Sequence, residues 1–99
     1  MMITAEQVRE YLRIPYADDD SFIERIIKQG YDYLKDAIDD YDELYRENQI
    51  FSGKCDMWVL TYWTPGAYDQ REGMFTGKPE MDYSARAMIT QLQLYRKDK

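Results

Sequence analysis

Hydrophobic residues recur at helical spacing along most of the chain, with polar residues between them. After Thr4, which fits a capping box with Gln7, Val8 and Leu12 lie one turn apart, so a short helix is predicted that Pro15 ends. The spacings of three and four residues that follow predict a second, longer helix. Its apolar face holds Phe22, Ile23, Ile26, Ile27, Leu34, Ala37, Ile38 and Tyr41.

Charged residues mark both ends of this long helix. The run Asp18-Asp19-Asp20 and the following Ser21 offer several possible N-caps, and Ser21 with Glu24 would form a second capping box. The negative charge of the run also favours the positive end of a helix dipole. Acidic side chains near the C-terminal end of a helix destabilise it, because that end of the helix dipole is negative. We therefore expect the helix to end near residues 41–44 and residues 45–53 to form a connection.

The most apolar stretch predicts a buried third helix that begins near residues 52–56. Apolar side chains cover most of its circumference, which indicates burial in the core or against a neighbouring subunit. Residues 58–63 could instead form a strand, because most of their residue types favour β-structure, but the wider pattern favours a helix. The apolar residues are Cys55, Met57, Trp58, Val59, Leu60, Tyr62 and Trp63.

Glycine and proline divide the rest of the chain. Gly30 lies on the apolar face of the second helix, where we expect it to admit the backbone of a neighbouring element. Pro65 and Gly66 are expected to kink or break the third helix, and residues 73–81 predict a loop or an irregular hairpin. A last helix then has an apolar stripe of Ala85, Met88, Ile89, Leu92 and Tyr95. The chain is therefore predicted to be one all-α domain over residues 1–99, a small bundle of about four helices.

The residue types exclude most enzyme chemistry. The chain has no histidine and one cysteine, so we expect neither a zinc site nor a Ser-His-Asp or Cys-His nucleophile in a lone subunit. The run Asp18-Asp19-Asp20 lacks the ligand spacing and the glycine of a calcium loop. Asp69 and Glu72 would need a cleft and shifted pKa values to act as an acid–base pair. We therefore predict no catalytic residue, no metal and no cofactor.

Charge and aromatic content favour assembly over nucleic-acid binding. The net charge is −6, and residues 1–50 carry thirteen acidic and six basic side chains, which repel phosphate. Ten Tyr, two Trp and three Phe offer contact surface of the kind enriched at protein–protein interfaces. The last helix, with Arg86, Gln91, Gln93 and Arg96, keeps a small nucleic-acid-binding or regulatory module as the alternative. No stretch reaches the ~20 apolar residues of a membrane helix, so no membrane partner is expected.

The opening block combines Met2-Ile3-Thr4, a short helix that ends in Tyr11-Leu12-Arg13-Ile14, an acidic turn and a long amphipathic helix. This block resembles the start of the head–tail connector family of tailed phages, whose members are also described as DNA-packaging or head-completion proteins. Residues 68–72 resemble the "YxxRE" segment of that family, and residues 87–96 resemble its closing helix. Three features depart from the family pattern: Gly30, where the family usually has alanine, Pro65-Gly66, which interrupts the third helix, and the link between the second and third helices.

The resemblance implies an all-helical, non-enzymatic subunit of a phage or prophage virion, made and assembled in the bacterial cytoplasm. It implies a homo-oligomeric ring beneath the portal protein after DNA packaging, which receives a stopper or tail-completion protein and lets DNA pass without specific binding. The candidate subunit-interface residues are Trp63, Tyr68, Arg71 and Glu72. The candidates for an acidic lumen, or for a solvated outer face, are Asp32, Asp36, Asp39 and Asp40.

Overall fold

Helices make up almost all of the computed structural model, which describes residues 2–69 and 83–95. The elements are α1 (Ala5–Leu12), α2 (Asp20–Ala37), α3 (Tyr41–Glu47), α4 (Gln49–Trp58), the π-helical turn η1 (Val59–Trp63), α5 (Thr64–Asp69) and α6 (Tyr83–Leu92). No strand occurs in these two ranges, so the all-α prediction is confirmed. The loop or hairpin expected at residues 73–81 lies outside the described residues.

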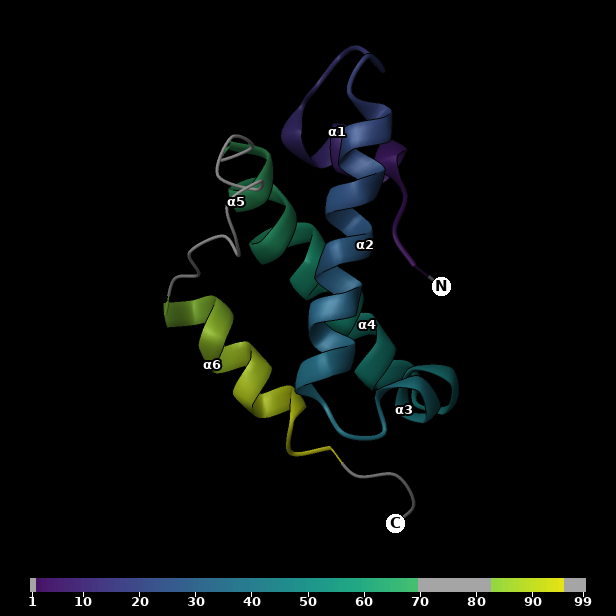
Figure 1. The fold of residues 1–99 in the computed structure, drawn as a ribbon, viewed down its shortest axis with the longest axis vertical. Coiled ribbons are helices and arrows are strands. Elements are labelled where there is room, and N and C mark those ends of the chain that lie inside the picture. The colour runs from purple at the N-terminus through teal and green to yellow at the C-terminus, as the bar shows by residue number, and fades with distance from the viewer. Residues whose placement is uncertain (1, 70–82, 96–99) are drawn as a thin grey trace.

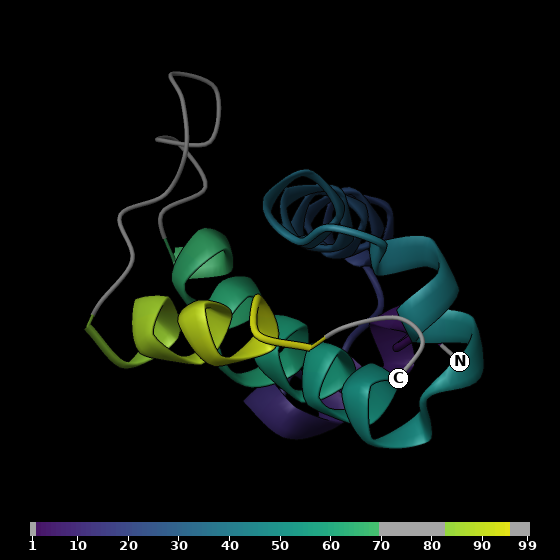
Figure 2. The same ribbon diagram turned by 90° about the horizontal axis from the view of Figure 1, so that it is seen from below.

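A continuous rod of α4, η1 and α5 crosses α2 and forms the centre of the fold (Figure 1). Turned by 90°, the same view shows α2 on one side of the rod and α6 along another (Figure 2). Helix α6 runs antiparallel to α4, because Trp58 Nε1 donates to the Ala85 carbonyl and Lys54 Nζ donates to the Tyr95 hydroxyl. The molecule is elongated, with extents of 44 × 25 × 19 Å.

The first helix begins and ends as its sequence predicts. The Thr4 hydroxyl accepts the Gln7 backbone N–H at 3.2 Å, and Gln7 Oε1 accepts the Thr4 N–H at 2.9 Å, which completes the capping box. Arg13 then takes a left-handed conformation, with φ of 61°, and closes the helix two residues before Pro15.

The second capping box, predicted from Ser21 and Glu24, is wrong. Helix α2 begins at Asp20, two residues before the start that an N-cap at Ser21 would give, and its N-cap Asp19 makes no side-chain cap hydrogen bond. Both carboxylates bind distant partners instead: Asp20 Oδ1 accepts from Arg9 Nε at 2.8 Å, and Asp19 Oδ2 accepts from the Tyr68 hydroxyl at 2.6 Å. These tertiary bonds tie the start of α2 to α1 and α5. Only the dipole partnership expected of Asp20 holds.

The end of α2 and the expected connection over residues 45–53 are also corrected. The helix ends at Ala37, Ile38 is extended, and Asp40 is left-handed with φ of 60°. A separate helix, α3, follows because Tyr41 and Leu44 give it a buried face of its own. The Asn48 side chain then accepts the Phe51 N–H at 3.0 Å and caps α4, which begins at Gln49 and not at residues 52–56.

Of the kink or break expected at Pro65, the break is wrong, because the helical rod continues through this residue. The turn before it is a π-helix in which the Thr64 N–H donates to the Val59 carbonyl, five residues back. A π-turn is wider than an α-turn and makes room for a proline ring whose missing N–H would interrupt an α-helix at this point. The helix therefore continues through Pro65 and Gly66 as α5.

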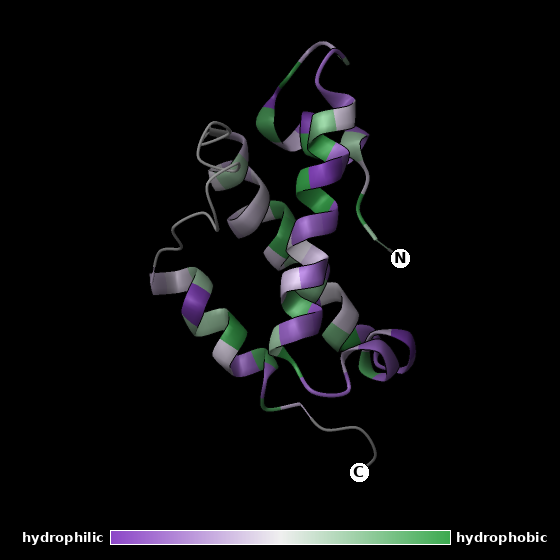
Figure 3. Ribbon diagram, in the orientation of Figure 1, coloured by the Kyte–Doolittle hydropathy of each residue, from purple (hydrophilic) through white to green (hydrophobic). Residues whose placement is uncertain are grey.

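Hydropathy follows the predicted faces (Figure 3): along α2 and α6, hydrophilic positions alternate with hydrophobic ones at helical spacing. The buried side chains form one cluster that joins α1, α2, α3, the central rod and α6. The largest fully buried members are Trp58, Phe51, Ile23, Ile26, Leu34 and Leu92.

Candidate interaction surfaces

A single carboxylate organises the polar centre of the molecule. The hydroxyl groups of Tyr31 and Tyr45 both donate to Asp56 Oδ1, at 2.7 and 2.6 Å. The Tyr31 hydroxyl also accepts the Ile3 backbone N–H at 3.0 Å. One carboxylate on α4 therefore joins α2, α3 and the N-terminal segment. The sequence analysis missed this residue, although Asp56 is the only acidic residue between positions 48 and 68.

Burial holds three tyrosines and the cysteine around this centre in their neutral forms. It raises the pKa of Tyr31, Tyr41 and Tyr45 well above the ordinary value of 10.0, and the hydrogen bond to Asp56 adds to the rise for Tyr31 and Tyr45. Burial, with the nearby Asp56 charge, also raises the pKa of the Cys55 thiol from 9.0 to about 12. A buried, protonated thiol is a poor nucleophile, as expected for a small core residue.

Both tryptophans lie in the core and are hydrogen-bonded there. Trp63 Nε1 donates to the Ile26 carbonyl at 2.9 Å, as Trp58 does to Ala85. Tyr33 stacks on Trp58 with an interplanar angle of 17° and contacts Trp63 at a ring distance of 5.4 Å. Only 5% of Trp63 is exposed, so it can support a subunit interface only through the residues that cover it.

The other predicted interface residues are only partly described. Tyr68 is half-buried on α5, where its hydroxyl holds Asp19 and its ring lies 6.4 Å from that of Phe22. Arg71 and Glu72 lie outside the described residues. The structure therefore places Tyr68 beside the start of α2, at one end of the rod.

The four predicted acidic residues are all exposed. Asp32 and Asp36 lie one turn apart on α2, and Asp39 and Asp40 form the turn into α3. Lys28 Nζ pairs with Asp32 Oδ2 at 2.8 Å. A shallow hollow of about 450 Å³ lies at the turn and is lined by Lys35, Ile38, Asp39, Asp40, Tyr41, Asp42 and Glu43. This end of the molecule presents concentrated negative charge.

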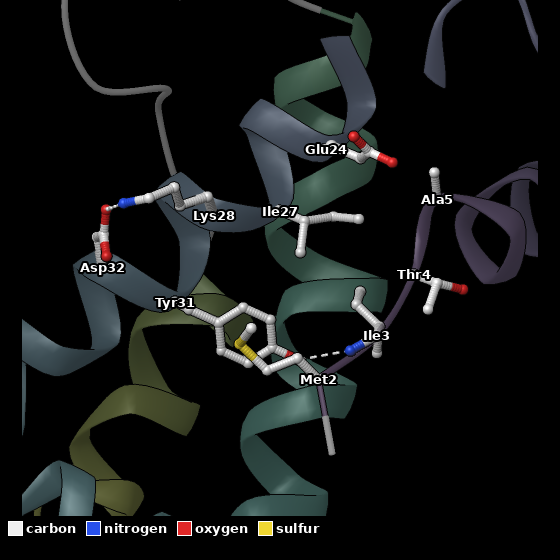
Figure 4. Close-up of a pocket in the computed structure, with 9 residues that line it drawn as sticks. All are labelled: Met2, Ile3, Thr4, Ala5, Glu24, Ile27, Lys28, Tyr31 and Asp32. Carbon is white, nitrogen blue, oxygen red and sulfur yellow. Dashed lines mark hydrogen bonds and ion pairs between the residues drawn. The ribbon is translucent and has the colours of Figure 1, made fainter. Parts of the chain in front are cut away.

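An apolar groove of about 480 Å³ lies between the N-terminal segment and one side of α2 (Figure 4). Ile3, Ile27 and Tyr31 form its floor, and Met2 lies at its edge with more than half of its surface exposed. The Ile3–Tyr31 hydrogen bond and the Thr4 capping box hold the segment in place, so the groove is preformed. Its polar rim consists of Glu24, Lys28 and Asp32.

The outer face of α6 is a second exposed surface. Ala85, Ile89 and Leu92 are buried against the rest of the molecule, whereas Tyr83 and Leu94 are 80% and 70% exposed. Between these two lies a shallow hollow of about 390 Å³, lined by Tyr83, Arg86, Ala87, Thr90 and Gln91. Arg86 is the only charged residue between positions 83 and 95.

Within residues 2–69 and 83–95, no group of three or more metal-ligating side chains converges. No described helix is long and apolar enough to cross a membrane. The hydrogen-bonded polar centre around Asp56 is structural in its contacts. The arrangement thus offers surfaces for packing and a charged end.

Residues 2–91 match the model of the phage gp6-like head–tail connector protein family. The chain belongs to this family. The match covers every described helix apart from the last residue of α6, so the resemblance seen in the opening block extends over nearly the whole fold. No curated protein and no solved structure matches the chain. Membership makes this connector a structural component of a phage virion, at the junction of head and tail.

Proposed function

We propose that this connector assembles as a homo-oligomeric ring beneath the portal protein after DNA packaging, and that the ring receives a stopper or tail-completion protein. The family match over residues 2–91 carries the proposal. A ring of identical subunits needs two different contact patches on each subunit, since the contact is head-to-tail. The groove beside α2 and the outer face of α6 are two such patches, of different shape and composition.

The acidic end of the molecule has a role in this proposal. Asp32, Asp36, Asp39 and Asp40 face the passage for DNA, where like charge keeps the duplex from adhering to the wall. A conduit must let the genome leave, so repulsion is the useful property. The same charge opposes the alternative of a nucleic-acid-binding regulator, which would need concentrated Lys and Arg.

The four interface residues keep their proposed place at the subunit contact. Tyr68 would present its ring edge at the α5 end of the rod, and Arg71 and Glu72 follow it directly in sequence. Trp63 would support the contact indirectly, because its hydrogen bond to the Ile26 carbonyl fixes the position of the rod on α2. The proposal includes no catalytic step: assembly takes place in the bacterial cytoplasm, and the product is part of the virion.

Sedimentation velocity tests this function. The cognate portal ring, mixed with excess connector, should have a higher sedimentation coefficient than the portal alone. The mass derived from it should exceed that of the portal by the mass of one ring of connectors. Duplex DNA added to the connector alone should sediment unchanged at physiological salt. If the portal gains no mass and the connector binds duplex with a steep salt dependence, the regulatory module is the better account.

A further inference from the structure

We infer that the outer face of α6 of one connector docks into the groove between the N-terminal segment and α2 of the next. This inference rests on the proposed ring and names the two surfaces that form its repeated contact. The outer face of α6 is defined by Tyr83, Arg86, Thr90, Gln91 and Leu94. The groove is the one described above, with Met2, Ile3, Ile27 and Tyr31 at its floor and edge and Glu24, Lys28 and Asp32 at its rim.

The two surfaces lie where a head-to-tail contact needs them. Figures 1 and 2 place α6 on one side of the subunit and the N-terminal segment on the other, in both views. An α6-to-groove contact on one side thus leaves a groove, or an α6, free on the other side for the next copy. Repetition of such a heterologous contact closes into a ring when the rotation between copies allows it.

Their chemistry is complementary. The α6 face has exposed apolar residues at both ends, Tyr83 and Leu94, and carries one charge, the Arg86 guanidinium. The groove has an apolar floor, and the Glu24 carboxylate lies at its rim, toward Ala5 (Figure 4). Within residues 2–69 and 83–95, neither Arg86 nor Glu24 has an ion-pair partner. Docking would pair the two charges across the contact.

The size of the contact explains why subunits would assemble on the portal. The stretch from Tyr83 to Leu94 is about 16 Å long at the rise of an α-helix. Such a contact uses fewer residues than the ~20–30 per side of a standard interface. A single contact would therefore be weak in free solution. Connectors already bound to the portal lie next to one another, which raises their effective concentration and stabilises the same contact.

Disulfide trapping detects a weak contact of this kind. In the doubly substituted connector Lys28→Cys/Thr90→Cys, one new thiol lies on the groove rim and the other on the α6 face, both exposed. Copper–phenanthroline oxidises facing thiols to a disulfide and takes up their two electrons. We expect a ladder of dimers, trimers and larger species on a non-reducing gel, both at high protein concentration and on the portal. Cys55 is fully buried and stays in place in every variant.

The matched control is Lys28→Cys/Met57→Cys, because Met57 is also exposed but lies on α4. It should give no ladder, and each single variant should give no species larger than a dimer. A charge swap adds a second readout: Arg86→Glu should lower the trapping yield of the Lys28→Cys/Thr90→Cys connector several-fold, and Glu24→Arg added to it should restore the yield. Arg46→Glu, the same substitution at an exposed position on α3, should leave the yield unchanged.

The outcomes separate this inference from the proposed function. If the connectors join the portal but the Lys28–Thr90 pair gives no ladder, the α6–groove contact is wrong and the ring stands. If the connectors associate neither with each other nor with the portal, the proposed function fails and the inference fails with it. If Arg86→Glu changes duplex binding and leaves trapping unaltered, the α6 face serves nucleic acid and the inference is overturned.

Discussion

Gly30 lies directly under the indole ring of Trp63. A Cβ atom at position 30 would be 2.7 Å from Trp63 Cδ1, closer than such atoms can approach, and the same indole donates to Ile26 one turn earlier on α2. The glycine therefore admits a side chain and not the neighbouring backbone, which corrects the expectation from sequence. This contact sets how closely the central rod crosses α2.

The first prediction follows from this contact. Displacing the indole should cost about 1–3 kcal/mol, and alanine gains ~1 kcal/mol over glycine in a helix, so Gly30→Ala should destabilise the connector by up to about 2 kcal/mol. Urea unfolding, followed by far-UV circular dichroism, measures the difference in the free energy of unfolding.

Gly53 supplies the control, since it is an exposed helical glycine whose added Cβ would meet nothing within 4 Å. Gly53→Ala should stabilise the connector by about 0.5–1 kcal/mol. Equal stabilisation by both substitutions would show that Trp63 is not packed on Gly30 in solution.

A second prediction concerns Asp56. Asp56→Ala leaves the Tyr31 and Tyr45 hydroxyls without their acceptor and should cost about 2–4 kcal/mol of unfolding free energy. Asp56→Asn keeps an acceptor oxygen and should cost less. Addition of Tyr45→Phe to Asp56→Ala should recover part of the loss, because it removes one of the two orphaned hydroxyls. Stability unchanged by Asp56→Ala would contradict the network.

The raised pKa values predict loss of stability at high pH. Tyr31, Tyr41 and Tyr45 are more acidic in the unfolded chain than in the folded one, and so is Cys55, whose folded pKa is about 12. Their contribution is complete below the unfolded values of 9.0 and 10.0 and is lost as pH rises above them. The thermal midpoint should be level between pH 7 and about pH 8.5 and then fall.

Absorbance at 295 nm checks this prediction directly, because it reports ionised tyrosine. Because their pKa values are raised in the fold, Tyr31, Tyr41 and Tyr45 should ionise only as the connector unfolds. A single titration step with all ten tyrosines, while the helical signal is intact, would argue against the burial described here.

A fourth prediction uses a buried hydroxyl without a partner. Thr64 is fully buried, and its Oγ1 has no hydrogen-bond partner in the described structure. Thr64→Val keeps the shape and removes the unpaired group, so it should be neutral or stabilise by about 1 kcal/mol. Thr61→Val, at a hydroxyl that donates to the Met57 carbonyl, should not stabilise. Thermal unfolding of the two variants decides the point.

The acidic surface gives a fifth prediction. Replacement of Asp36, Asp39 and Asp40 by lysine should make portal-bound connectors retain duplex DNA, with retention that falls steeply as salt is raised. The control carries the same charge change at Glu6, Glu10 and Asp18, which are exposed near α1. Equal retention by both sets would show that the α2–α3 end does not line the passage.

Local signals predicted local structure well. The Thr4 and Gln7 pair predicted its capping box because both partners lie within one turn, and helical spacing predicted the buried face of α2. The box at Ser21 failed because neighbouring carboxylates bind Arg9 and Tyr68, residues distant in sequence, and nothing local reveals such partners.

The remaining errors have the same origin. The left-handed Asp40 separates α2 from α3. An aspartate can take that conformation, and no neighbouring residue in the sequence predicts that it does. A π-turn before Pro65 keeps the rod continuous, although proline alone predicts a break. The role of Asp56 could not be predicted, because its hydrogen-bond donors Tyr31 and Tyr45 are distant in sequence. Family resemblance, in contrast, was visible in the opening block and is confirmed over residues 2–91.

Electron microscopy of the cognate portal, imaged with and without the connector, tests the central claim most directly. The account predicts an added ring of connectors on the tail-facing side of the portal, with α6 of each copy against the N-terminal groove of its neighbour and the α2–α3 turn facing the channel. A bare portal at saturating connector concentration, or connectors attached singly without contact between copies, would contradict it.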